Sequence, residues 1–132
     1  MKWFVVLLII IPTAFSLDYA KKLDFSKDEH ILQSNDKFYS FKLHMVQKFL
    51  LSGHCIEKNK LCMAKDVLFK KLKPKKDIPL NGGVNLGTIV CVKYLSGNLV
   101  TMRNNSGHQL SICEFPDRSM ISTGILEKLL LD

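Results

Sequence analysis

Two cysteine–histidine neighbours are the residues in this sequence whose types and spacing could support catalysis. His54 adjoins Cys55, and His108 lies five residues before Cys113. A thiol nucleophile needs a base within hydrogen-bond reach and a further group that orients the base. Neither pair stands in a recognisable protease motif, so these residues do not predict an enzyme.

The same part of the chain offers ligands for a metal. His54, Cys55 and Cys62 are nitrogen and sulfur donors of the kind that zinc prefers, but six residues separate the two cysteines, unlike the short spacing of closed zinc sites. Asp117 is a candidate catalytic carboxylate, yet its place in "FPDRS" suits a turn in which the side chain bonds its own backbone. We therefore expect no metal, no cofactor and no catalytic residue.

The amino terminus has the layout of a secretory signal peptide. Lys2 supplies a positive charge, an apolar run extends from Trp3 to Ile11, and small residues stand at Ala14 and Ser16. The run is too short for a membrane-spanning helix, which needs about 20 residues. We expect removal of residues 1–16, a periplasmic or secreted mature chain, and no transmembrane helix in that chain.

Export decides how the four cysteines are interpreted. An even number of cysteines in a small exported chain favours disulfides over free thiols or zinc. Three pairings are open, and spacing favours the two local ones, Cys55 with Cys62 and Cys91 with Cys113. On the chain-entropy model these bonds are worth roughly 2.5 and 3.4 kcal/mol.

The charge of the chain is basic and locally concentrated. The formal net charge is +7 at pH 7, which favours acidic partners such as anionic lipid or glycan. Because the chain is expected outside the cytosol, we expect no nucleic-acid partner. The candidate anion-binding residues form the lysine segment, which consists of Lys70, Lys71, Lys73, Lys75 and Lys76 around Pro74. The plainer alternative is that these lysines only keep the protein soluble.

Residues 17–72 predict a helical unit that would position the first cysteine pair. The stretch "NDKFYSFKLHMVQKFLLSG" carries an apolar face at helical spacing, and Asn35 or Asp36 could cap its start. A second helix is expected from about Lys60 to Leu72, so that a disulfide would pin a helical hairpin. The residues of the apolar face are Phe38, Phe41, Met45 and Phe49. They are interpreted as core, with membrane contact as the alternative.

A basic Pro/Gly linker, residues 73–84, separates this unit from a small cystine-containing α+β domain, residues 85–132. In that domain Asn85 is a suitable helix cap and Gly97 a suitable stop, although "TIVCV" also fits a strand. The runs "NLVTMR" and "HQLSICEF" flank the turn signal "NNSG", which predicts a β-hairpin. The tail "TGILEKLLLD" predicts a closing helix. The fold class expected is thus α+β, a helical hairpin followed by a helix and a β-hairpin.

The second unit also carries a family pattern. Its elements are an Asn-led segment, a Gly-x-Leu strand, a Gly-containing turn, two cysteines and a Pro-Asp-x-Ser turn. In this chain they are Asn85, Cys91, Gly97, Leu99, Gly107, Cys113, Pro116, Asp117 and Ser119. From Asn85 to about Ile121 the chain thereby resembles a short domain of unknown function in exported bacterial proteins, often labelled as hemolysins. The family usually has glycine where this chain has Arg118. The resemblance implies export and a small cystine-containing fold.

Two classes of function follow. The first is an exported, non-catalytic binding module whose partner is an anionic envelope lipid or glycan, or an exported protein; an inhibitor of an exported enzyme is a special case. The second is a membrane-active, hemolysin-like protein, as the resemblance implies.

Overall fold

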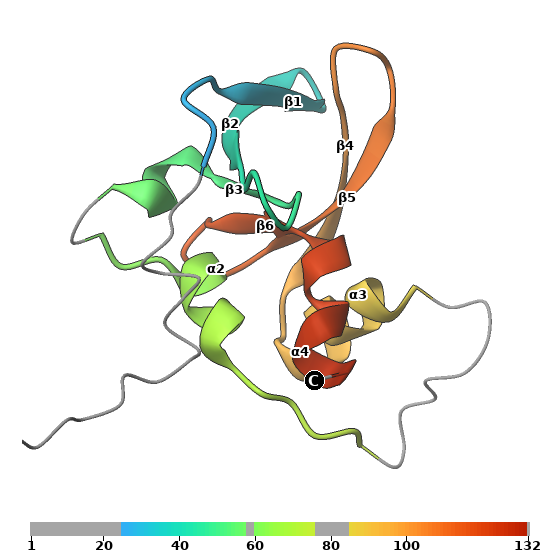
Figure 1. Cartoon of the computed structure of the whole chain (residues 1–132). Coiled ribbons are helices and arrows are strands. Elements are labelled where there is room, and N and C mark those ends of the chain that lie inside the picture. The colour runs from blue at the N-terminus through green and yellow to red at the C-terminus, as the bar shows by residue number, and fades with distance from the viewer. Residues whose placement is uncertain (1–24, 58–59, 76–84, 132) are drawn as a thin grey trace, which may run out of the picture.

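The computed structural model describes residues 25–57, 60–75 and 85–131, without the side chain of Leu131. Within these ranges six strands form a closed antiparallel barrel in the order β1-β2-β3-β6-β5-β4 (Figure 1). Because β4 lies beside β1, the first four strands have Greek-key order. The strands are β1 (His30–Ser34), β2 (Lys37–Leu43), β3 (Leu50–Ser52), β4 (Asn98–Arg103), β5 (Gln109–Glu114) and β6 (Met120–Ser122).

The expected helical hairpin is wrong, because the residues of its first helix form strands. Ser34 pairs with Lys37 across a two-residue turn, in which Asn35 and Asp36 have φ angles of 48° and 64°. Positive φ at both central residues defines the type I′ hairpin turn, for which Asn and Asp are favoured. The residues interpreted as a helix cap are therefore the turn that joins β1 to β2.

The apolar face expected on that helix is also divided by the strand geometry. Successive side chains of a strand point to opposite faces. Phe41 is fully buried in the barrel, whereas Phe38 is 69% exposed. Farther along, Phe49 is buried and Met45 is 47% exposed. The four residues do not share a face, and only two of them belong to the core.

The second helix expected in this unit is reduced to two short turns. The α-helical turn α2 (Met63–Asp66) runs into the 3₁₀ turn η3 (Val67–Phe69), and Lys70 is already extended, with φ −83° and ψ 142°. The expected helix does not continue to Leu72. Instead of bonding within a helix, the N–H of Leu72 donates to the carbonyl of Leu129 of α4 (Glu127–Leu131) at 3.0 Å. Apolar spacing alone did not reveal this contact.

The second half of the chain has the local elements that the sequence predicts. The Asn85 side chain caps α3 (Leu86–Ile89) by accepting from the N–H of Thr88, and α3 continues into the π-helical turn η4 (Val90–Tyr94). Strands β4 and β5 form the expected hairpin. After β6, the 3₁₀ turn η5 (Thr123–Ile125) leads into the closing helix α4 (Glu127–Leu131).

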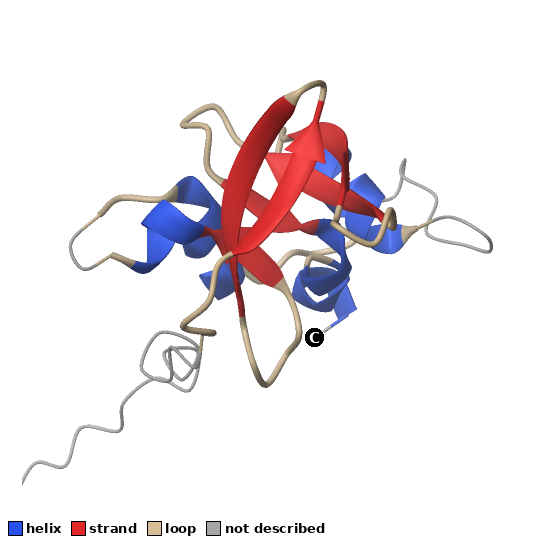
Figure 2. Ribbon diagram, turned by 90° about the horizontal axis from the view of Figure 1, so that it is seen from above, coloured by secondary structure: helices blue, strands red, loops and turns tan. Residues whose placement is uncertain are grey.

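The helices α2, α3 and α4 lie towards one end of the barrel, below most of the strands in Figure 1. Seen from above, the strands cross in the centre with helical segments on both sides (Figure 2). Two clusters of buried residues result, one inside the barrel and one between the barrel and the helical turns. The first contains Leu32, Phe41, Met102, Ile112 and Met120. The second includes both cysteine pairs, Val90, Ile121 and Leu126.

Both halves of the chain contribute strands to the barrel, because β3 pairs with β6 and β1 with β4. Within the described ranges no helix is long and apolar enough to cross a bilayer. The expected signal peptide, residues 1–16, and residues 76–84 of the expected linker lie outside the described residues.

Candidate functional site

All four cysteines are in disulfides, in the two local pairings favoured by spacing. Cys55 is bonded to Cys62, and Cys91 to Cys113, with no free cysteine. The first bond joins the 3₁₀ turn η2 (Gly53–Ile56) to the start of α2, and the second joins η4 to β5. Such bonds are typical of chains that fold in an oxidising compartment.

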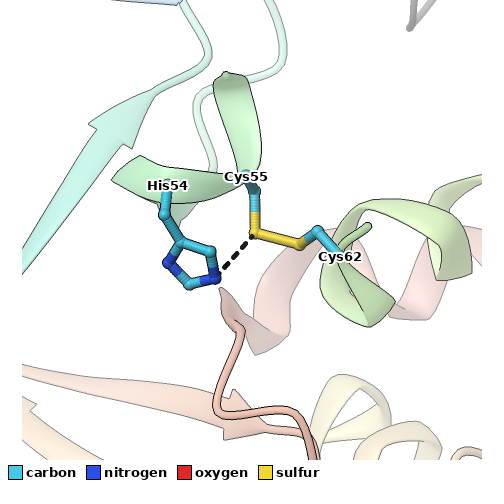
Figure 3. A group of neighbouring side chains, drawn as sticks. All are labelled: His54, Cys55 and Cys62. Atoms are coloured by element: carbon cyan, nitrogen blue, oxygen red, sulfur yellow. Dashed lines mark hydrogen bonds between the residues drawn. A yellow bond between two sulfur atoms is a disulfide. The ribbon is translucent and has the colours of Figure 1, made fainter. Parts of the chain in front are cut away.

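The cysteine–histidine pairs cannot perform thiol chemistry in this oxidised state. Nε2 of His54 lies 3.8 Å from Sγ of Cys55, but that sulfur is bonded to Cys62 (Figure 3). His108 is exposed beside the β4–β5 turn, whereas Cys113 is fully buried and bonded. Each sulfur lacks the thiolate form that a nucleophile requires.

Asp117 has the structural role of a turn and cap residue. Its Oδ1 accepts hydrogen bonds from the N–H and hydroxyl of Ser119, and its Oδ2 accepts from the N–H of Met63 at 2.8 Å. Burial raises the pKa of Asp117, but these hydrogen bonds and the charge of His54 outweigh it, so the pKa lies below its usual value. The carboxylate therefore ties the "FPDRS" turn to the first residues of α2.

The lysine segment is exposed, and its backbone is hydrogen-bonded to the rest of the molecule at Leu72 and Lys75. Lys70, Lys71, Lys73 and Lys75 are exposed, while Leu72 between them is half-buried and packs against the core. The N–H of Leu72 donates to Leu129, and the N–H of Lys75 donates to the hydroxyl of Tyr94 at 2.8 Å. Lys76 lies outside the described residues.

Tyr94 and Lys93 belong to this site, and sequence reasoning missed both. The Lys75 ammonium lies 5.2 Å from the centre of the Tyr94 ring and 3.5 Å from the carbonyl of Lys93. Lys93 is itself an exposed cation of η4, and its backbone carbonyl contacts the segment. The contacts bridge 18 and 19 positions of sequence, so no local pattern could have indicated them.

The cations of this site are not neutralised by described carboxylates. Among residues 25–57, 60–75 and 85–131, the ion pair found joins Lys60 to Glu57. Lys70, Lys71, Lys73 and Lys93 make no side-chain hydrogen bond with a described residue. Their ammonium groups are therefore available to an anion in solution.

Comparison of the chain with protein-family models, with curated proteins and with solved structures finds no match.

The residues that carry the family pattern have structural roles in this fold. Asn85 caps α3, and Gly107, with φ 82°, lies in the β4–β5 turn. A Cβ at Gly97 would lie 2.4 Å from Sγ of Cys113, so this position has no room for a side chain. Arg118, which stands where the family has glycine, has a φ of 72° in the left-handed region that glycine favours.

A groove of about 890 Å³ lies on another side of the barrel, between β1, the β4–β5 turn and η5. Its walls mix apolar side chains such as Ile31 and Leu110 with amides and hydroxyls, and Lys48 and Lys128 stand at its edge. The described lining contains no cysteine and one carboxylate, that of Glu29.

Proposed function

We propose that the protein is an exported, non-catalytic binding module that holds a linear polyanion, an acidic glycan, against the lysine segment and Lys93. The observation that carries this proposal is the row of exposed lysines on a backbone hydrogen-bonded to the fold at Leu72 and Lys75. The two disulfides support the exported part of the proposal.

The shape of the segment favours a chain-like ligand. Lys70 is extended, and the residue before Pro74 is restricted to extended or polyproline conformations, so the lysines follow one another along a line. Neighbouring charges on such a line lie within a Debye length, about 8 Å at physiological salt, and act together on one polyanion. A linear acidic glycan can meet several of these cations at once.

The membrane-active alternative has less support. The resemblance implied it, and the expected aromatic helix face offered a surface to enter the lipid, but Phe41 and Phe49 are buried core residues. In the described part of the segment, residues 70–75, the large apolar side chain is that of Leu72, which is half-buried against the core. A basic segment without an apolar anchor is expected to bind lipid only through charge.

The test compares two triple variants that lose the same charge. Lys71→Gln, Lys73→Gln and Lys93→Gln are combined in the first, and three exposed lysines elsewhere, Lys27, Lys37 and Lys60, are replaced by Gln in the second. Binding to a sulfated or carboxylated polysaccharide is measured by calorimetry at several salt concentrations. Each cation near an anionic surface is worth about 1 kcal/mol, so the first variant should bind at least about tenfold more weakly and with a flatter salt dependence.

The control variant should keep most of the affinity, and both variants should melt near the unmodified protein. Equal loss in the two variants would mean that net charge alone attracts the polyanion, and would contradict a site at the lysine segment. Binding and dye release with anionic liposomes, without binding to the polysaccharide, would favour the membrane-active alternative. Absence of any salt-sensitive binding would leave the rigid Asn104–Gly107 turn as the next candidate surface.

A further inference from the structure

The disulfide between Cys55 and Cys62 has a histidine next to it. His54 and Cys55 are consecutive residues of η2, and Cys62 is the residue that caps the start of α2. Nε2 of His54 and the two sulfurs all lie within 4.8 Å of one another (Figure 3). One imidazole nitrogen and two thiolates are donors that zinc prefers.

The distances between these atoms are close to those in a tetrahedral zinc site. With Zn–N about 2.05 Å and Zn–S about 2.3 Å, a tetrahedral angle places nitrogen and sulfur about 3.6 Å apart and two sulfurs about 3.8 Å apart. The observed distance from Nε2 of His54 to Sγ of Cys55 is 3.8 Å. To form the site, the two sulfurs have to separate from bonding distance to about 3.8 Å. Rotation of the cysteine side chains can supply this movement of less than about 2 Å.

The surrounding residues support a metal-binding state. Cys62 Sγ already accepts the N–H of Lys65 at 3.4 Å, an interaction that a thiolate would strengthen. Both cysteines are buried, whereas His54 is exposed, so a metal can enter from the side of the imidazole. Because His54 is exposed, the fourth position of a tetrahedral ion would be open to water.

We propose that Cys55, Cys62 and His54 form a zinc site when an external dithiol reduces their disulfide. Reduction transfers two electrons and two protons from the dithiol, which itself becomes a disulfide, and leaves two thiols on the protein. Zinc then binds both sulfurs and Nε2, and the two thiol protons are released to solvent. The disulfide and the zinc site are alternative states of the same three residues.

The second disulfide is an internal control for this chemistry. Cys91 and Cys113 are also buried, but no such group of three nitrogen, sulfur or carboxylate donors includes them among the described residues. Zinc should therefore favour reduction of one disulfide and leave the other unchanged.

The experiment measures reduction of each disulfide against a dithiol redox buffer, with and without zinc at a fixed free concentration. Freed thiols are alkylated and assigned to each pair by peptide mass mapping. If free zinc is about 100 times its dissociation constant, linkage raises the equilibrium constant for reduction of Cys55–Cys62 about 100-fold. The reduction of Cys91–Cys113 should not change.

Two matched variants separate a folded site from cysteines that bind zinc in an unfolded chain. His54→Gln removes one ligand and should abolish most of the zinc effect, whereas His108→Gln changes another exposed histidine and should retain it. A zinc effect that is absent, equal for the two disulfides, or unchanged in His54→Gln would overturn the proposal. A zinc effect confined to Cys55–Cys62 and dependent on His54 would support it.

Discussion

Replacement of Gly87 by alanine should destabilise the protein, although alanine favours helices. Gly87 lies in α3, where this change alone would be favourable by about 1 kcal/mol. In the folded chain, however, a Cβ on Gly87 would lie 2.0 Å from the carbonyl oxygen of Thr123 and 2.7 Å from its carbonyl carbon. Both are backbone atoms of η5, so no side chain can rotate away to make room.

The loss of stability in Gly87→Ala depends on how far α3 and η5 have to move apart to make room for the Cβ. Ordinary contact begins near 3.4 Å, so α3 and η5 would have to separate by about 1.4 Å. Buried residues on both sides, Val90 and Leu126, would lose close packing as a result. Overpacking of this kind costs about 1–3 kcal/mol, and with backbone on both sides we expect the upper part of that range. For a domain of this size, Tm should fall by about 10–20 °C.

The assay is thermal unfolding by circular dichroism with both disulfides intact. Gly124→Ala is the matched control, because Gly124 lies in η5 itself and a Cβ there meets nothing within 4 Å. This control should be neutral or stabilising by up to about 1 kcal/mol. If both variants melted within about 2 °C of the unmodified protein, the close packing of α3 against η5 would be refuted.

Three further predictions concern single side chains. Asp117→Ala removes hydrogen-bond acceptors for α2 and should cost about 1 kcal/mol at neutral pH. The pKa of Asp117 is lowered in the folded state from 3.8, so its contribution to the free energy of unfolding is present above about pH 4 and is lost as pH falls through the folded pKa. Urea unfolding should therefore show a smaller stability difference between Asp117→Ala and the unmodified protein at about pH 2 than at neutral pH. Arg118→Gly removes the side chain that strains the left-handed backbone at this position. It should stabilise the fold by about 1 kcal/mol and raise Tm by a few degrees; a lower Tm would show that the Arg118 side chain makes a stabilising contact. Tyr94→Phe removes the hydroxyl that accepts a hydrogen bond from the N–H of Lys75. Loss of this bond, worth less than about 1 kcal/mol, should weaken polyanion binding about threefold with little change in Tm. Unchanged binding in calorimetry would exclude Tyr94 from positioning the segment.

The accuracy of sequence prediction in this chain depended on how local the deciding interactions are. The hairpin around Asn104–Gly107 and the cap at Asn85 were predictable, because turn and cap residues act on their immediate neighbours. The turn at Asn35 and Asp36 was misinterpreted, because the same residue types also begin helices. Only the positive φ angles of both residues distinguish the two structures.

The candidate site was predictable in part for the same reason. The four lysines of the described segment are evident from composition, whereas the contribution of Lys93 depends on the packing of η4 against that segment. Likewise, the pairing of cysteines followed from spacing, but the proximity of His54 Nε2 to both sulfurs required the backbone path of η2 and α2.

The interleaved strand order has a consequence for when the chain can fold. Leu51 of β3 pairs with Ile121 of β6, and Gln33 of β1 pairs with Arg103 of β4. Until the ribosome has supplied residues 98–122, the first three strands have no partners with which to close a barrel. Strand pairings this distant in sequence form slowly, because the chain loses the entropy of closing a long loop before the stabilising contacts form. The local β1–β2 hairpin can form early, but closure of the barrel has to wait until β4 and β6 have been synthesised.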